Sequence, residues 1–406
     1  MKILKFFILR IFFKRPLLVV SMILLLFIAN YLTFTAARSV ISTYQGYQEM
    51  GMLNKKGNYV ANLDPKDDVN FDKIKKTDTQ EVYTFLNNNY NYAFRTDGFV
   101  TSLKNKKNME VSLNYINEES YKLSNIDLTK GKDMTFDYNY KEEKIPVLIG
   151  SGLSKSYPLG TTIKITDGVT KEPITLKVQG ILKKNTHHSN FYAPNSKNYF
   201  NFSIFVPVNK HFINNSNLDL QVNGLMDIVI LDTNKEKATE LSQFIQKNLD
   251  MKFNFFSQQE NFHFFEDYYF NSMKMISIIS IILIIVMTVI AIWNTLMSIR
   301  LMIKDFTINL LVGLSYSKLR LIFYSYFGIL FSINLAILFI ITAYNRYGNW
   351  LRKDSLFATY GIFGLINMDW IALIAVVLID IIIGLIIVEI SIKRIKKIPI
   401  SLGVLQ

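Results

Sequence analysis

The residues of this chain that could do chemistry are few and poorly spaced for catalysis. The chain has no cysteine and four histidines, and only His187 and His188 are neighbours. An adjacent pair does not chelate a metal as an i,i+4 helical pair does, and residues 183–201 have the composition of a surface loop. The string Gly150–Ser156 lacks the second glycine of a phosphate-binding G-x-x-x-x-G-K-[ST] loop. We therefore expect no catalytic residue, cofactor or metal on this chain.

One acidic residue stands out because of its surroundings. Asp380 lies near the middle of an otherwise strongly apolar stretch, residues 370–392, which Glu389 also interrupts. A carboxylate is costly in lipid, so Asp380 should face protein or water. It either belongs to a proton or substrate pathway or makes a polar contact to a neighbouring helix, for example to Asn294 or Asn334. We expect the structural contact, because one acidic residue without a basic partner in any span makes a poor relay.

Four apolar stretches have the length of transmembrane helices. About 20 helical residues cross a hydrocarbon core of about 30 Å. The first stretch has a longer apolar core than the roughly 7–15 residues of a signal peptide, so we predict that it remains as a helix. The predicted spans are residues 16–38, 273–299, 321–345 and 370–392.

The basic residues indicate the orientation of these spans. The net charge is +13, but residues 38–270 are nearly neutral, with 28 basic and 27 acidic side chains. The excess lies beside the apolar stretches, which is typical of membrane topology and not of a nucleic-acid surface, so we expect no nucleic-acid partner. The basic flanks predict that residues 1–15, 300–320 and 393–406 are cytoplasmic, with both termini inside. Residues 39–272 and 346–369 are then outside.

The sequence thus predicts a membrane protein of four transmembrane α-helices, one plus three, with a large α+β extracytoplasmic domain after the first. Residues 1–15 resemble a helix on the inner membrane surface, although a longer first span fits the same pattern. Residues 39–50 and 258–274 contain no proline, so each adjoining span can continue outward as a stalk helix. Strands are expected at residues 59–63, 163–166, 174–182, 203–208 and 226–231, and helices at 79–88 and 235–249.

The cytoplasmic segment 300–320 contains the string Lys304 to Ser315. Its pattern predicts a short amphipathic helix that ends at Gly313 and is followed by Ser315. Such a helix would form a compact cytoplasmic knob. An ordinary helical hairpin connection has the same spacing.

These features resemble the MacB-type (type VII) ABC transporter permeases, which include FtsX-like proteins. The span layout is the same, and Asp305–Ser315 looks like the family's E-I-G-I-L-R-A-L-G-A-S. Asp305 takes the acidic place, and Ile308, Gly313 and Ser315 match. Residues 149–184 look like the family's outer-domain core, and residues 399–402 resemble its closing P-x-x-A-L. Residues 307, 309 and 310 differ from this family pattern, and these differences concern how a partner ATPase would dock.

The resemblance implies a permease subunit in a bacterial cytoplasmic membrane, embedded in lipid as a homodimer or with a paralogous permease. A separate cytoplasmic ABC ATPase would bind ATP and Mg²⁺ and move the outer domain. The cargo would be amphiphilic: a peptide, bacteriocin, antibiotic or lipoprotein, with an extracytoplasmic adaptor as a further partner. The alternative is an FtsX-like transmitter that activates an outside partner such as a cell-wall hydrolase. The implied ATPase-coupling residues are Lys304, Asp305, Ile308, Leu310, Gly313, Leu314 and Ser315, and the intramembrane polar residues are Asp380 and Asn294.

Overall fold

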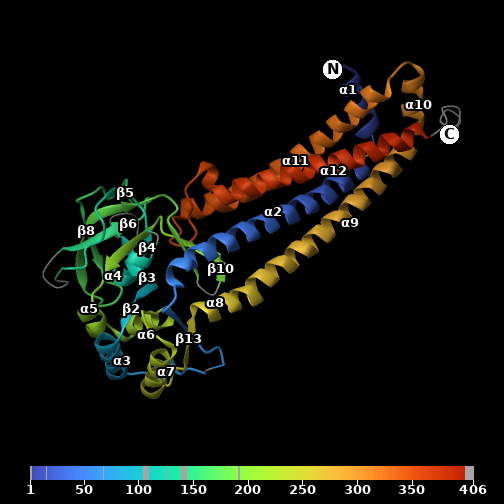
Figure 1. Cartoon of the computed structure of the whole chain (residues 1–406). Helices are drawn as coiled ribbons and strands as arrows, with labels where there is room; N and C mark the ends of the chain where they lie inside the picture. The colour runs from blue at the N-terminus through green and yellow to red at the C-terminus, as the bar shows by residue number, and fades with distance from the viewer. Residues whose placement is uncertain are drawn as a thin grey trace. The chain divides into compact units, whose positions relative to one another are not determined.

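The computed structural model describes residues 2–14, 16–66, 68–103, 109–124, 126–138, 144–190 and 193–397. The chain forms two compact units (Figure 1). Unit 1 contains residues 1–41, 271–345 and 365–406, and unit 2 contains residues 42–270 and 346–364. The match at residues 399–402 lies outside the described residues.

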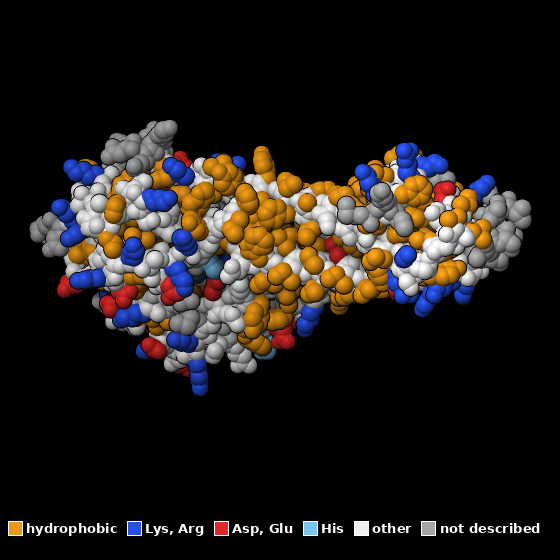
Figure 2. All heavy atoms as spheres, turned by 90° about the horizontal axis from the view of Figure 1, so that it is seen from above, with side chains coloured by type: hydrophobic (Ala, Val, Ile, Leu, Met, Phe, Trp, Pro, Cys, Tyr) orange, Lys and Arg blue, Asp and Glu red, His pale blue; other side chains and the backbone are white. Residues whose placement is uncertain are grey.

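Unit 1 is helical, and within its described residues four helices are long and apolar enough to cross a membrane. Proline is tolerated at the first position of a helix, and Pro16 begins the first of the four. Hydrophobic side chains remain exposed along these helices, as expected where lipid replaces water (Figure 2). The long helices are α2 (Pro16–Leu53), α9 (Asn271–Leu301), α11 (Tyr316–Arg352) and α12 (Asn367–Lys396).

Short helical segments accompany the long ones. Helix α1 (Lys2–Phe6) continues into the π-helix η1 (Phe7–Phe12), and α10 (Ile303–Leu311) lies between α9 and α11. Helix α1, helix α10 and the C-terminal end of α12 lie at the same end of the long helices (Figure 1). Basic side chains gather there, as the positive-inside rule expects of one membrane side (Figure 2).

Among the described residues, two ion pairs join long helices of unit 1. Arg38 Nε of α2 lies 3.1 Å from Oδ1 of Asp369, which is buried in the first turn of α12. Arg320 Nε of α11 lies 3.0 Å from Oε1 of Glu389 of α12, which also accepts a hydrogen bond from Tyr324 Oη at 3.0 Å. Glu389 therefore has a basic partner on the neighbouring span.

Unit 2 contains a seven-stranded mixed sheet. The pairs β4–β11 and β6–β8 are parallel and the other pairs are antiparallel. A β-bulge between Thr96 and Phe99 interrupts the pairing of β3 with β4. The sheet order is β3 (Arg95–Leu103), β4 (Met109–Ile116), β11 (Ser203–Pro207), β6 (Ile145–Ile149), β8 (Pro173–Leu182) and β5 (Leu128–Gly131), with β7 (Thr162–Thr166) also paired to β8.

A four-stranded antiparallel sheet and several helices complete the α+β core. Helix α7 buries Ala238, Leu241, Ile245 and Leu249, which recur at helical spacing on one face. The sheet order is β13 (Phe253–Ser257), β1 (Tyr59–Leu63), β12 (Val229–Leu231) and β2 (Asn91–Ala93). The helices are η2 (Phe71–Lys73), α3 (Lys76–Asn89), α4 (Glu118–Leu123), α5 (Lys210–Asn215), α6 (Leu218–Met226) and α7 (Lys235–Leu249).

The chain continues from β13 into helix without a proline or glycine. Helix α8 (Gln258–Phe264) is followed by the π-helix η4 (Phe265–Phe270), which leads directly into α9. The ring of Tyr47, on α2, lies 4.6 Å from the ring of Phe265. Both expected stalk segments are therefore helical, and aromatic rings join them.

The loop predicted for residues 183–201 is wrong. This segment contains a β-hairpin of β9 (His187–Asn190) and β10 (Ala193–Tyr199), which places His187 and His188 on a strand. Its Asn, Ser and Lys residues disfavour strands on average, but cross-strand pairing and contacts with α2 override that preference. The strand expected from residue 226 starts later, because α6 extends to Met226.

Candidate functional site

The predicted coupling segment is a short, two-faced helix. In α10, Ile303, Phe306 and Thr307 are buried in the apolar core of unit 1. Lys304 and Ile308 lie one turn apart on the opposite, exposed face. This face continues through Leu311 and Val312, whose side chains are 59% and 84% exposed.

The end of α10 fits the glycine that the sequence places there. Gly313 has a φ of +102°, in the region that favours glycine. Gly313 N donates to Leu310 O at 3.1 Å, and Leu314 N donates to Asn309 O at 2.9 Å. This pair of bonds is a Schellman motif, so the predicted helix end is confirmed. Ser315 Oγ then accepts a long bond of 3.3 Å from Lys318 N, in the first turn of α11.

The predicted coupling residues divide into two groups. Lys304, Ile308, Gly313 and Ser315 are exposed, and Asp305 is half-buried. Leu310 and Leu314 are also half-buried, and they pack against the apolar core, which indicates a supporting role. Leu311 and Val312 are not among the residues predicted from the sequence, although positions 304, 308, 311 and 312 share one helical face.

The structure identifies a polar partner of Asp380 on a neighbouring helix. Asp380 is buried in α12, and its Oδ2 accepts a hydrogen bond of 3.1 Å from Asn30 Nδ2 of α2. Asn294 instead donates to Ser21 Oγ at 2.9 Å. Asp380 therefore has a polar contact to a neighbouring helix, but its partner is Asn30 of the first span and not Asn294, one of the two examples expected from the sequence. Asn30 and Asp380 join the first and fourth spans.

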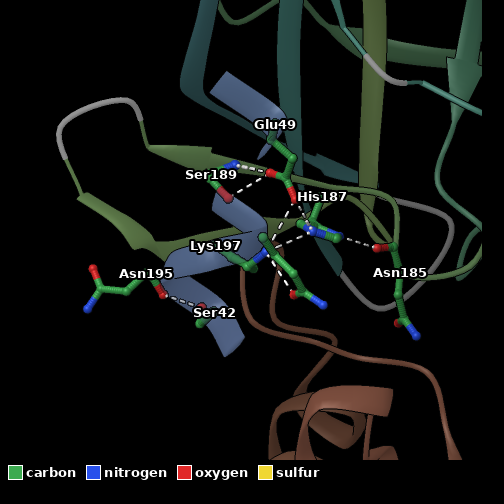
Figure 3. A network of polar contacts seen from close by, with 8 residues as sticks. Ser42, Glu49, Asn185, His187, Ser189, Asn195 and Lys197 are labelled. Atoms are coloured by element: carbon green, nitrogen blue, oxygen red, sulfur yellow. Dashed lines mark hydrogen bonds and ion pairs between the residues drawn. The ribbon is translucent and has the colours of Figure 1, made fainter. Parts of the chain in front are cut away.

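In unit 2, a polar network ties the outer part of α2 to the β9–β10 hairpin (Figure 3). Glu49 Oε1 lies 2.7 Å from His187 Nε2 and 3.2 Å from Lys197 Nζ. Glu49 Oε2 accepts from Ser189 N at 3.1 Å and from Ser189 Oγ at 2.6 Å. His187 Nδ1 lies 2.8 Å from Asn185 O, and His187 Nε2 also lies 3.2 Å from Lys197 Nζ.

The electrostatics of this network keep the carboxylate ionised. Glu49 lies beyond the predicted first span, in the part of α2 that belongs to unit 2. Burial alone would raise its pKa, but the hydrogen bonds and charges of His187, Ser189 and Lys197 outweigh burial and lower the pKa to about 2. Burial also lowers the pKa of Lys197, whose side chain is only 3% exposed, although the charge of Glu49 opposes that effect.

The segment between the third and fourth spans is part of unit 2. Tyr199 N of β10 donates to Leu356 O at 2.7 Å. Asn201 Nδ2 donates to Ala358 O at 2.9 Å, and Asn185 Nδ2 donates to Tyr360 O at 2.7 Å. Three backbone carbonyls of a segment predicted as a simple loop are therefore bonded to the outer domain. Sequence alone gave no signal for this, because such bonds depend on backbone position and not on residue type.

Comparisons with known proteins give matches only among solved structures. No protein-family model and no curated protein matches the chain. The extracellular domain of the noncanonic ABC-type transporter YknZ from Gram-positive bacteria is 14% identical, over 49% of this chain and 100% of that chain, with a TM-score of 0.32. The periplasmic region of MacB from Actinobacillus actinomycetemcomitans is 15% identical, over 52% of this chain and 92% of that chain, with a TM-score of 0.31.

Both matched structures are extracytoplasmic domains of transport proteins, as their names state. At these identities and TM-scores, the likeness does not extend to an activity, a cargo or a partner. The fold class predicted from sequence is confirmed: four candidate spans, with a large α+β domain between the first and the second.

Proposed function

We propose that this chain is the permease subunit of an ABC transporter. A separate cytoplasmic ATPase, carrying ATP and Mg²⁺, docks on α10 and drives motion of the outer domain. The cargo class is amphiphilic: a peptide, bacteriocin, antibiotic or lipoprotein. The working assembly contains two permease copies or this chain with a paralogue.

The observation that carries the proposal is the exposed face of α10. It combines one base, Lys304, with three apolar side chains, Ile308, Leu311 and Val312, at one end of the helices. Large apolar side chains exposed together on a water-facing helix mark a protein interaction site. The chain offers no phosphate-binding loop, which fits an ATPase on a separate chain.

A capture experiment tests the proposal. The full chain is solubilised in detergent with its native partners, and bound proteins are identified by sequence and by ATP hydrolysis. We expect a subunit with a G-x-x-x-x-G-K-[ST] motif to remain with the natural chain. Val312→Glu should lose it, because a charge then occupies the most exposed apolar position of the face.

The matched control is Val100→Glu, the same substitution at a 49% exposed valine of β3 in unit 2. It should leave the captured ATPase unchanged. Absence of any ATPase from the natural chain, or its retention by Val312→Glu, would refute the proposed docking surface.

A further inference from the structure

The N-terminal helical segment has two contrasting faces. Phe7, Ile8, Ile11 and Phe12 are buried in the apolar core of unit 1. The opposite face combines apolar and basic side chains, all exposed, and it consists of Lys5, Phe6, Leu9, Arg10, Phe13 and Lys14. No acidic residue occurs among residues 1–37. One segment therefore presents an aromatic face inward and a cationic, amphipathic face outward.

The inward face lies directly on the coupling helix. The Phe7 ring stacks on the ring of Phe306 of α10, with centroids 6.1 Å apart. Phe12 also contacts Phe306 at 6.1 Å, and it stacks on Tyr326 of α11 at 4.2 Å. Phe306 is fully buried by these contacts and by Phe323 of α11, whose ring lies 5.7 Å away. The N-terminal segment is thus part of the support on which α10 rests.

The outward face has the chemistry of an anionic lipid surface. Phe6, Leu9 and Phe13 are 49%, 55% and 36% exposed, and each of them is next to a basic residue in sequence. Apolar side chains that enter the acyl boundary while Lys and Arg meet phosphates are typical of interfacial helices. Each base near an anionic leaflet strengthens binding about fivefold, so three give a preference on the order of a hundredfold over a neutral leaflet.

We propose that residues 4–14 bind the anionic lipid headgroups of the inner leaflet and thereby set the position of α10. The segment then makes ATPase coupling depend on anionic lipid. This inference rests on the proposed function in two respects: that this end of the helices is cytoplasmic, and that α10 is the docking site of the ATPase. A nucleic acid does not fit this face, because apolar side chains separate the basic residues of the face from one another.

The absence of cysteine permits a direct test, since one introduced cysteine is the only labelling site. An environment-sensitive dye is attached at Leu9→Cys in the full chain, in nanodiscs of pure phosphatidylcholine or with added phosphatidylglycerol. Brominated lipid should quench the dye strongly only when phosphatidylglycerol is present. Leu9→Cys combined with Lys5→Gln, Arg10→Gln and Lys14→Gln should lose that dependence.

The matched control removes three exposed bases from the end of α12: Lys393→Gln, Arg394→Gln and Lys397→Gln. It changes the net charge equally and should keep the lipid dependence. Equal quenching in both lipid mixtures, or equal behaviour of the two triple variants, would overturn the inference. The inference would also be overturned if residues 4–14 bound a protein that kept the brominated lipid away from the dye, because a protein would then cover this face.

The link to α10 has its own readout. A dye at Val312→Cys should change its emission when phosphatidylglycerol is added, and Phe12→Ala should abolish that change while Leu9 remains quenched. If no ATPase docks, the Leu9 result still stands and only the proposed function fails. If an ATPase docks but Leu9 is never quenched, the proposed function stands and this inference fails.

Discussion

Removal of the Glu49 carboxylate should release the β9–β10 hairpin from α2. In the folded chain, this group meets the side chains of His187 and Lys197 and two donors of Ser189. Glu49→Ala leaves the ammonium of Lys197, 3% exposed, without its counter-charge. Breaking a buried pair costs about 3–5 kcal/mol, and Glu49 is itself 26% exposed. We therefore expect a loss at the lower end, about 3 kcal/mol.

Hydrogen exchange of the full chain measures this loss locally. For amides that exchange through opening of the hairpin, about 3 kcal/mol corresponds to roughly 150-fold faster exchange. The amides of β10 should show this acceleration, while those of α3 should not change. Glu49→Gln should give a smaller effect, because the amide keeps the shape and accepts hydrogen bonds without the charge.

The matched control is Glu81→Ala, at an exposed position on α3. It should change the exchange of β10 by less than about 0.5 kcal/mol, as surface substitutions usually do. Unchanged exchange in Glu49→Ala, or an equal effect in Glu81→Ala, would refute the reasoning that this carboxylate fastens the hairpin.

Three further predictions concern single positions. The depressed pKa of Glu49, about 2, means that its contribution is fully present above its ordinary pKa of 4.5 and is lost as pH falls toward 2; exchange of β10, corrected for its intrinsic pH dependence, should accelerate in that window and not in Glu49→Gln. Gly46→Ala should lower thermal stability by about 1–3 kcal/mol, because its Cβ would lie 2.0 Å from a backbone oxygen of β10; Gly51→Ala, on the same helix with no atom within 4 Å, should be neutral or stabilising. Asp380→Asn should keep folded yield and transport, because an amide can also accept from Asn30; loss of transport at unchanged yield would instead show that the carboxyl takes part in function.

Sequence patterns predicted the helical parts of this protein well. Long apolar runs predict the spans, and the boundaries of α7 follow from its periodic core face. Gly313 marked the end of α10, because few other residues adopt its φ. These features depend on residues that are close in sequence.

The errors concern contacts between distant residues. The β9–β10 hairpin is rich in polar residues, and its place is fixed by Glu49, far away in sequence. In β3, Asp97 and Gly98 fall where a bulge breaks the alternation, so the strand pattern is hidden. The pairing of Asn30 with Asp380 depends on how the first span packs against the fourth, which hydropathy does not specify.

The boundaries between the units have a mechanical consequence. The chain passes from one unit to the other at four places, after residues 41, 270, 345 and 364. The first three fall within uninterrupted helical runs: α2, residues 258–301 and α11. A helix resists stretching and twisting far better than a glycine-rich linker does. We therefore expect a rotation applied at one end of such a helix to be transmitted to its other end with little loss. Glycine pairs inserted at these three junctions would replace rigid helical connections with flexible ones, while the core of each unit would stay unchanged.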